Sequence, residues 1–154
     1  GKFLVDSNLG LHLFWVLTLK LHNRHPLHLA CMCGTSTEIT KRIIDCYPNA
    51  AAMPDTPEHQ LPFHIAVSHN APFETLHILL DAYPDAVKTH TKTKGFLPLH
   101  MACCHRKADA TIVQFLLDKY PDGAMVSLKS IESKCSKLYY FNSLLTKRMR
   151  NVFC

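Results

Sequence analysis

The sequence contains little glycine and no arrangement typical of a catalytic or nucleotide-binding site. Only five residues are glycine, at positions 1, 10, 34, 95 and 123, which is too sparse for a phosphate-binding loop. No His-Glu-x-x-His zinc motif is present. His64 and His69, like His100 and His105, would lie about 140° apart around a helix, so neither pair shares a face. The sequence therefore predicts no catalytic residue, no metal ion, no cofactor and no small-molecule substrate.

Signals for secretion or membrane insertion are also lacking. The apolar run of residues 9–21 is interrupted by His12, Thr18 and Lys20. It is shorter than the ~20 residues that a membrane-spanning helix needs. There is no N-x-Ser/Thr glycosylation sequon and no signal peptide with a small-residue cleavage site. The seven cysteines are an odd number, so we expect free thiols in a reducing compartment, the cytoplasm or alternatively the nucleus.

Most of the chain has no excess of positive or negative charge. The 17 Lys and Arg residues against 12 Asp and Glu give a net charge of +5. Residues 1–126 hold 11 basic and 11 acidic side chains, so residues 127–154 carry the whole excess. This distribution does not indicate a globally basic nucleic-acid binder. The chain is 47% hydrophobic, which allows a packed core, and its 154 residues fit one domain.

The sequence does contain an internal repeat. Pro-Leu-His-Leu-Ala at residues 26–30 recurs as Pro-Phe-His-Ile-Ala at 62–66 and as Pro-Leu-His-Met-Ala at 98–102, each 36 residues later. A second landmark, Tyr-Pro, follows nearly the same period, and its copies begin at Tyr47, Tyr83 and Tyr120. Two landmarks in three copies indicate repeated structural units. The repeats span about 25–60, 61–96 and 97–126.

Each repeat predicts a pair of helices. A proline in the first turn of a helix costs no hydrogen bond, so a short helix begins at Pro26, Pro62 and Pro98. A longer helix with apolar residues at i, i+3, i+4 and i+7 follows and ends before Tyr-Pro. One such pair cannot bury its apolar face alone. The fold class is therefore an all-α helical-repeat solenoid of three stacked repeats (25–126), with divergent segments at 1–24 and 127–154.

The repeat resembles the ankyrin repeat, whose period is about 33 residues. The resemblance rests on the Pro-Leu-His-Leu-Ala motif and the following amphipathic helix, over residues 25–126. His25, Leu61 and Leu97 precede the prolines where a Thr is usual, and each repeat is longer. The resemblance implies a non-enzymatic interaction module whose histidines bond to backbone rather than to a metal. The structural signature consists of Pro26, His28, Pro62, His64, Pro98, His100, Tyr47, Tyr83 and Tyr120.

Two sulfur-rich segments are interpreted as core and surface rather than as a zinc site. Cys31 and Cys33 would point about 200° apart on a helix, which makes a poor chelate. Cys31 and Cys103 align with the apolar Val67 and would lie about 20 Å apart, given 8–10 Å between packed helices. We expect both to be buried thiols. The residues just after these two positions, toward the end of each short helix, are expected to be exposed: Cys33, Cys104 and His105.

The loops between repeats are the candidate contact surface. Residues 88–95 alternate basic side chains with Thr, so an extended loop would present one cationic edge to an acidic partner. The preceding loop, residues 53–60, is acidic and contains two prolines, so a partner groove would be charge-asymmetric. The resemblance adds variable positions at the end of the short helices. The candidate partner-binding residues are Met32, Cys33, Asp55, Glu58, His59, Gln60, Ser68, His69, Lys88, His90, Lys92, Lys94, Phe96, Cys104 and His105.

The basic C-terminal segment leaves two functional readings open. Apolar residues between Leu128 and Val152 recur at intervals of three and four, as in a helix that caps the last repeat or packs on a partner. The first hypothesis is a scaffold that binds another protein through its concave face and loops. The alternative is an electrostatic adaptor that docks on an anionic membrane or on nucleic acid through residues 127–154.

A truncation tests whether the C-terminal segment is a cap. Deleting residues 127–154 should expose Val113, Leu116 and their neighbours, at a cost of several kcal/mol if each Å² of apolar surface contributes roughly 25 cal/mol. The truncated chain should melt well below the parent or aggregate, as seen by thermal melting and size-exclusion chromatography. A monomer with an unchanged melting temperature would show that the segment is no cap.

Overall fold

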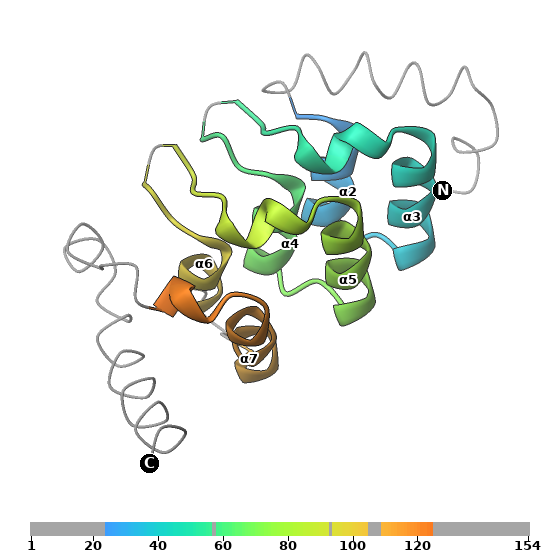
Figure 1. Cartoon of the computed structure of the whole chain (residues 1–154). Helices are drawn as coiled ribbons and strands as arrows, with labels where there is room; N and C mark the ends of the chain where they lie inside the picture. The colour runs from blue at the N-terminus through green and yellow to red at the C-terminus, as the bar shows by residue number, and fades with distance from the viewer. Residues whose placement is uncertain (1–23, 57, 93, 105–108, 125–154) are drawn as a thin grey trace.

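The computed structural model describes residues 24–56, 58–92, 94–104 and 109–124. This part of the chain is helical and contains no β-strand, which confirms the predicted all-α solenoid (Figure 1). The short inner helices are α2 (Pro26–Cys33), α4 (Pro62–Ser68) and α6 (Pro98–Cys104). The outer α-helices are α3 (Thr37–Cys46), α5 (Phe73–Ala82) and α7 (Ala110–Lys119). The 3-10 helices are η1 (Pro48–Ala52), η2 (Pro84–Lys88) and η3 (Pro121–Ala124).

Local sequence signals set the helix boundaries. Each inner helix begins at its proline, and each outer helix ends at the residue before Tyr-Pro. Gly34 follows α2 with φ of +62° and Asn70 follows α4 with φ of +51°, a left-handed turn that closes each helix. The Tyr-Pro landmark then opens a 3-10 helix, because proline fixes its own φ and lacks an N–H. The 3-10 helices η1 and η2 lie between an outer helix and a projecting loop.

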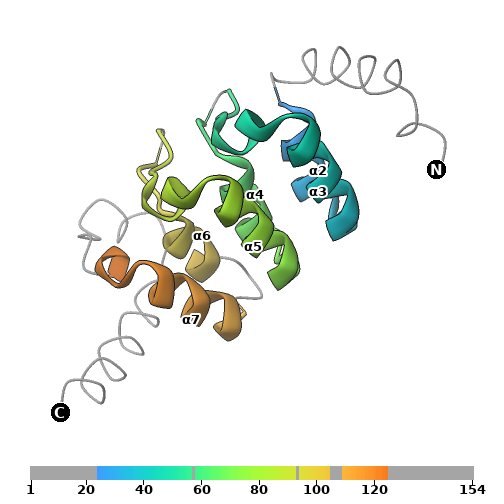
Figure 2. The same cartoon turned by 45° about the vertical axis from the view of Figure 1, so that its right-hand side comes forward.

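The helix pairs stack in a row, so that the inner helices form one layer and the outer helices a second (Figures 1 and 2). Helix α4 lies between α2 and α6, and α3 packs on α5. The α5–α7 contact is aromatic: the Phe115 ring packs edge-on against Phe73, with ring centroids 5.7 Å apart, and against His77 at 4.9 Å. Repeat two therefore has a neighbour on both sides, as a one-dimensional stack requires.

The core runs continuously through the stack. Leu27, Phe63 and Leu99 follow the three prolines of the inner helices and are all buried. The outer helices contribute the side chains that the periodicity predicts, including Leu76, Leu79, Val113 and Leu116, each less than 5% exposed. No helix in the described ranges is long and apolar enough to cross a membrane. The proposed terminal segments fall outside these ranges: only Arg24 of 1–24 is described, and none of 127–154.

The three repeated histidines bond to backbone groups through Nδ1, and His28 and His64 also do so through the second ring nitrogen. Nδ1 of His28, His64 and His100 accepts the backbone N–H three residues earlier, at 3.2, 3.1 and 3.0 Å. The opposite nitrogen of His28 lies 3.1 Å from the Gln60 carbonyl, and that of His64 lies 2.9 Å from the Thr89 carbonyl. Because Nδ1 accepts a hydrogen bond, it carries no proton, so the neutral ring has its proton on Nε2.

Burial reinforces this requirement for a neutral ring. The three histidines are at most 3% exposed. Desolvation lowers the pKa of each of them to about 4, against 6.5 for an unperturbed histidine. A proton on Nδ1 would also break the hydrogen bond that begins each inner helix. His28, His64 and His100 therefore have a structural role, which is to bond the backbone at the start of each inner helix.

These pKa values predict acid unfolding. Below pH 6.5 these histidines bind protons in the unfolded chain, but in the folded chain they do so only near pH 4. The free energy of unfolding therefore falls as the pH decreases from 6.5 to 4. One histidine contributes about 1.4 kcal/mol per pH unit, and three contribute about 4. Circular dichroism should show cooperative loss of helix between pH 6.5 and 4. His77→Gln removes an exposed histidine of α5. It loses the ring contact with Phe115 and should lower overall stability, but the pH range of the transition should stay the same. A melting temperature that stays constant down to pH 4 would contradict the prediction.

Candidate interaction groove

Two loops project from the stack between successive repeats (Figure 1). We call residues 53–61 finger 1 and residues 89–97 finger 2. Each is closed by one buried polar side chain at the same repeat position. The Asp55 carboxylate in finger 1 accepts the Gln60 N–H at 2.7 Å, and the Thr91 hydroxyl in finger 2 accepts the Phe96 N–H at 3.0 Å. The same pairs are joined in the other direction by the Gln60 and Phe96 carbonyls, which accept the N–H of Asp55 and Thr91.

The turn of each finger needs a left-handed residue at an equivalent position. Gly95 in finger 2 has φ of +66°, and His59 in finger 1 has φ of +51°. Glycine adopts this conformation without a steric penalty, whereas a side chain does so rarely. Finger 1 therefore stores some backbone strain that finger 2 avoids.

Exposure alternates along finger 2 as the sequence pattern predicts. The side chains of His90, Lys92 and Lys94 are exposed, whereas Thr91 is 3% exposed and Thr89 is half-buried. The alternation arises without a β-strand, because the Thr91–Phe96 hydrogen bonds turn Thr91 inward. His90 and Lys92 are consequently exposed on either side of the buried Thr91, and Lys94 reaches toward finger 1.

The two fingers are tied to each other. The Lys92 backbone N–H donates to the Glu58 carbonyl at 3.1 Å. The Lys94 ammonium lies 4.0 Å from a Glu58 carboxylate oxygen, and the other oxygen accepts the Gln60 side-chain N–H at 2.6 Å. The acidic loop and the basic loop, which belong to separate repeats, thus face each other. The charges of Glu58 and Lys94 partly neutralise each other. The expected asymmetry of charge is reduced at this point.

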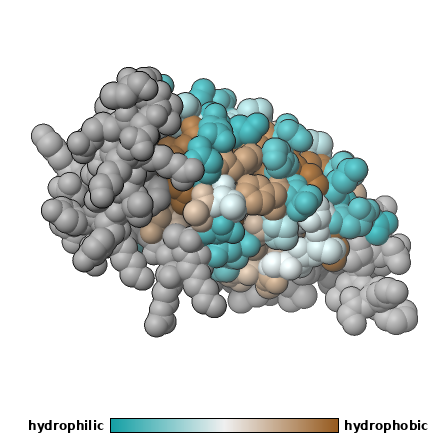
Figure 3. All heavy atoms as spheres, turned by 90° about the horizontal axis from the view of Figure 1, so that it is seen from below, coloured by the Kyte–Doolittle hydropathy of each residue, from teal (hydrophilic) through white to brown (hydrophobic). Residues whose placement is uncertain are grey.

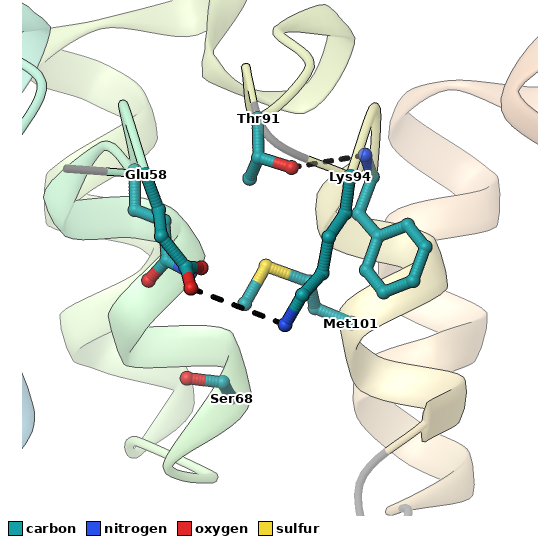
Figure 4. Close-up of a pocket in the computed structure, with 7 residues that line it drawn as sticks. Glu58, Ser68, Thr91, Lys94 and Met101 are labelled. Carbon is teal, nitrogen blue, oxygen red and sulfur yellow. Dashed lines mark hydrogen bonds and ion pairs between the residues drawn. The ribbon is translucent and has the colours of Figure 1, made fainter. Parts of the chain in front are cut away.

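Between the fingers lies a groove of about 230 Å³ (Figure 4). Glu58 and Lys94 reach toward each other across it. In this view Met101 from α6 lies between them, and Ser68 from α4 lies on the side away from Thr91. We call it the inter-finger groove, and its lining consists of Glu58, Gln60, Ser68, Thr91, Lys94, Phe96 and Met101. It is the hollow in which the candidate residues gather, because it takes side chains from two fingers and two inner helices.

A second hollow of about 440 Å³ lies on the outer-helix side, between η2 and α7. Its lining contains Leu80, Asp81, Pro84, Asp85, Val87, Lys88 and Lys119, of which only Lys88 was a candidate. Seen from below, the surface of the described residues mixes hydrophilic and apolar patches, without one dominant apolar face (Figure 3). This second hollow is the larger of the two, but Lys88 is the only candidate contact residue in its lining.

The structure brings together five of the candidate residues and separates the others. Glu58, Gln60, Ser68, Lys94 and Phe96 line the inter-finger groove. The remaining candidates with described side chains lie outside it: Met32, Cys33, Asp55, His59, His69, Lys88, His90 and Lys92. Cys104 belongs to α6, but its side chain is outside the description, as is the whole of His105.

Asp55 requires a correction. It was expected on a contact surface, but its side chain is 1% exposed and serves the hydrogen bond that closes finger 1. The second carboxylate oxygen accepts from the Arg24 guanidinium at 3.4 Å. A carboxylate can be buried when such partners satisfy it. Asp55 therefore has no accessible polar surface to offer a partner.

Sequence reasoning missed two residues of the groove, Thr91 and Met101. Met101 aligns in the repeat with Leu29 and Ile65, and that position follows the repeated histidine. An apolar residue at this position is expected to belong to the packed inner helix, as the buried Ile65 does, so the sequence gives no sign of a contact role. Thr91 is the inward residue of the alternating loop, so the pattern that predicted the exposed lysines also contained this signal.

The cysteines divide as the register predicts. Cys31 and Cys103 are buried in the core, and burial raises the pKa of the Cys31 thiol to about 12, so it stays a thiol. Cys33 and Cys46 are exposed and free. Within the described ranges, no group of three His, Cys, Asp or Glu side chains is placed to hold a metal ion.

A family model for ankyrin repeats, in three copies, matches residues 27–130. The chain belongs to the ankyrin-repeat family. No curated protein and no solved structure matches it in the corresponding comparisons. The ankyrin assignment agrees with the stacked helix pairs and with the His–backbone bonds that begin each inner helix. Ankyrin repeats generally serve as protein-interaction modules, and the family is typically non-enzymatic.

The equivalence of Asp55 and Thr91 generates a stability prediction for this ankyrin stack. Asp55→Ala leaves the Gln60 N–H without its acceptor and should lower the free energy of unfolding by about 1–3 kcal/mol. Asp55→Thr should retain more stability, because Thr91 closes finger 2 with the same bond. Urea denaturation followed by circular dichroism measures both variants. Equal losses in the two variants would show that the hydroxyl cannot replace the carboxylate.

Proposed function

We propose that this ankyrin stack is a non-enzymatic scaffold that binds a partner protein through the inter-finger groove and the neighbouring finger edges. The observation that carries the proposal is the convergence of five candidate contact residues from both fingers and α4 in one groove. Family membership supports the general class of function, because ankyrin repeats generally bind other proteins.

The construction of the groove suits binding. Its finger backbones and the Glu58 side chain are held in place before a partner arrives, since Glu58 is hydrogen-bonded to Gln60 and the fingers are joined through the Glu58 carbonyl. Binding to a preformed surface avoids much of the cost of ordering loops. The groove also combines an apolar floor with polar edges, as protein interfaces commonly do.

The electrostatic-adaptor alternative has no support from the described residues. It depends on residues 127–154, which lie outside them, and the family match does not favour it. The reducing intracellular location likewise stays a prediction. It is consistent with the free thiols of Cys33 and Cys46, which would be exposed to oxidation elsewhere.

Blocking the groove tests the scaffold proposal. Ser68 is the last residue of α4 and lines the groove, so Ser68→Arg places a long charged side chain in it while sparing the core. The full chain and the variant are used to capture proteins from source-cell lysate, with quantification by mass spectrometry. At least one specific interactor should lose about tenfold in recovery, equivalent to ~1.4 kcal/mol of binding free energy.

Asp81→Arg is the matched control, because Asp81 is exposed on α5 and lines the outer hollow. This variant should retain the interactor, and circular dichroism should show that both variants are folded. The proposal fails if no protein is captured specifically, or if all specific interactors remain with Ser68→Arg.

A further inference from the structure

The outer edge of finger 2 carries an unbalanced positive charge. Between Ala86 and Phe96 the sequence contains three lysines and one histidine and no Asp or Glu. Lys88 shares the outer hollow with Asp81 and Asp85, which offset its charge. Lys92 makes no ion pair with any residue that the structure describes, and its side chain is exposed. Lys92 and Lys94 therefore form the cationic end of the edge nearest the groove.

The ion pair between Lys94 and Glu58 is too weak to cancel the positive charge of Lys94. The Lys94 ammonium is 4.0 Å from Glu58, and the two side chains are 50% and 36% exposed. An ion pair with this exposure contributes at most about 1 kcal/mol, because water screens it and two long side chains must be held in place. Glu58 has a second partner in Gln60, so Lys94 can turn to another carboxylate without leaving Glu58 alone.

The floor beside these lysines is apolar. The half-buried side chains of Phe96 and Met101 line the groove together with Lys94. The groove's volume of about 230 Å³ is far above the ~10–15 Å³ that one water molecule needs, so water fills the empty groove. Water held against an aromatic ring and a thioether is favourably displaced by an apolar side chain. The groove therefore accepts an apolar group next to a site for carboxylates.

A peptide fits this combination better than a nucleic acid does. Nucleic-acid binding commonly uses about 6–10 phosphate contacts along a basic track, whereas two lysines stand here beside the carboxylate of Glu58. Glu58 would repel a continuous phosphate backbone at the mouth of the groove. A peptide can place separate carboxylates at Lys92 and Lys94 and turn an apolar side chain toward Phe96.

We infer that the inter-finger groove and the Lys92–Lys94 edge bind an acidic peptide segment of the partner, with an apolar side chain seated on Phe96 and Met101. The inference rests on the proposed scaffold function and specifies the chemistry of its partner. The carboxylates on the segment give specificity and faster association, and the apolar residue supplies most of the buried surface.

A random peptide library tests the inference on the full chain. Peptides of about twelve residues, which span about 40 Å when extended, are displayed on phage and selected against the immobilised protein. The enriched sequences should be net acidic, with an aromatic or aliphatic residue near the acidic ones. The best peptide is synthesised with a fluorophore, and its Kd is measured by fluorescence anisotropy.

Charge reversal locates the binding. Lys92→Glu should weaken the selected peptide by about tenfold or more, because attraction becomes repulsion. Lys41→Glu makes the same charge change at an exposed position on α3 and should leave the Kd within about twofold. Lys94→Gln should weaken binding less than Lys92→Glu, since it removes a charge without reversing it.

Several results would overturn the inference. These are a lack of enrichment, enrichment of neutral or basic peptides, a Kd unaffected by Lys92→Glu, or tighter binding of single-stranded DNA than of the selected peptide. If the selected peptides are neutral or basic and Ser68→Arg abolishes their binding, the acidic partner is ruled out but the scaffold function is retained. Failure of the scaffold function itself is seen separately, as the absence of any groove-dependent protein in the lysate capture.

Discussion

Each repeat depends on a neutral imidazole with two backbone partners. One ring nitrogen accepts a hydrogen bond from the N–H at the start of an inner helix. In His28 and His64 the other nitrogen donates to a carbonyl near the base of the following finger, that of Gln60 or Thr89. These bonds fix where a helix begins relative to the loop that projects beyond it. The neighbouring repeat excludes water from the ring, so the histidine depends on the stack and the stack depends on the histidine.

The inter-finger groove follows from this arrangement. His64 holds the root of finger 2 through the Thr89 carbonyl, and Thr91 then closes the finger on itself. His28 holds the end of finger 1 through Gln60, whose side chain orients Glu58. Two fingers anchored one repeat apart must run side by side, and their meeting over α4 and α6 leaves the hollow between them.

This construction separates stability from recognition. The buried polar side chains, His28, His64, Asp55 and Thr91, satisfy backbone groups and are inaccessible to a partner. Exposed charges such as Lys92 contribute little to the fold, and half-buried groups such as Met101 lie at the boundary. The surface of the fingers can therefore change its charge without loss of the stack, which is how a repeat architecture accommodates different partners.

The sequence by itself determined the repeat, its helix pairs and most helix boundaries, because proline, the residue before proline and the apolar period act within a few residues. It also identified the core thiols and the alternating edge of finger 2 through their register. Only the tertiary structure decided that Asp55 is buried, that Glu58 faces Lys94, and that Thr91 and Met101 complete a groove. Those outcomes depend on residues about one repeat apart along the chain, which come together only when the repeats stack and exclude water between them.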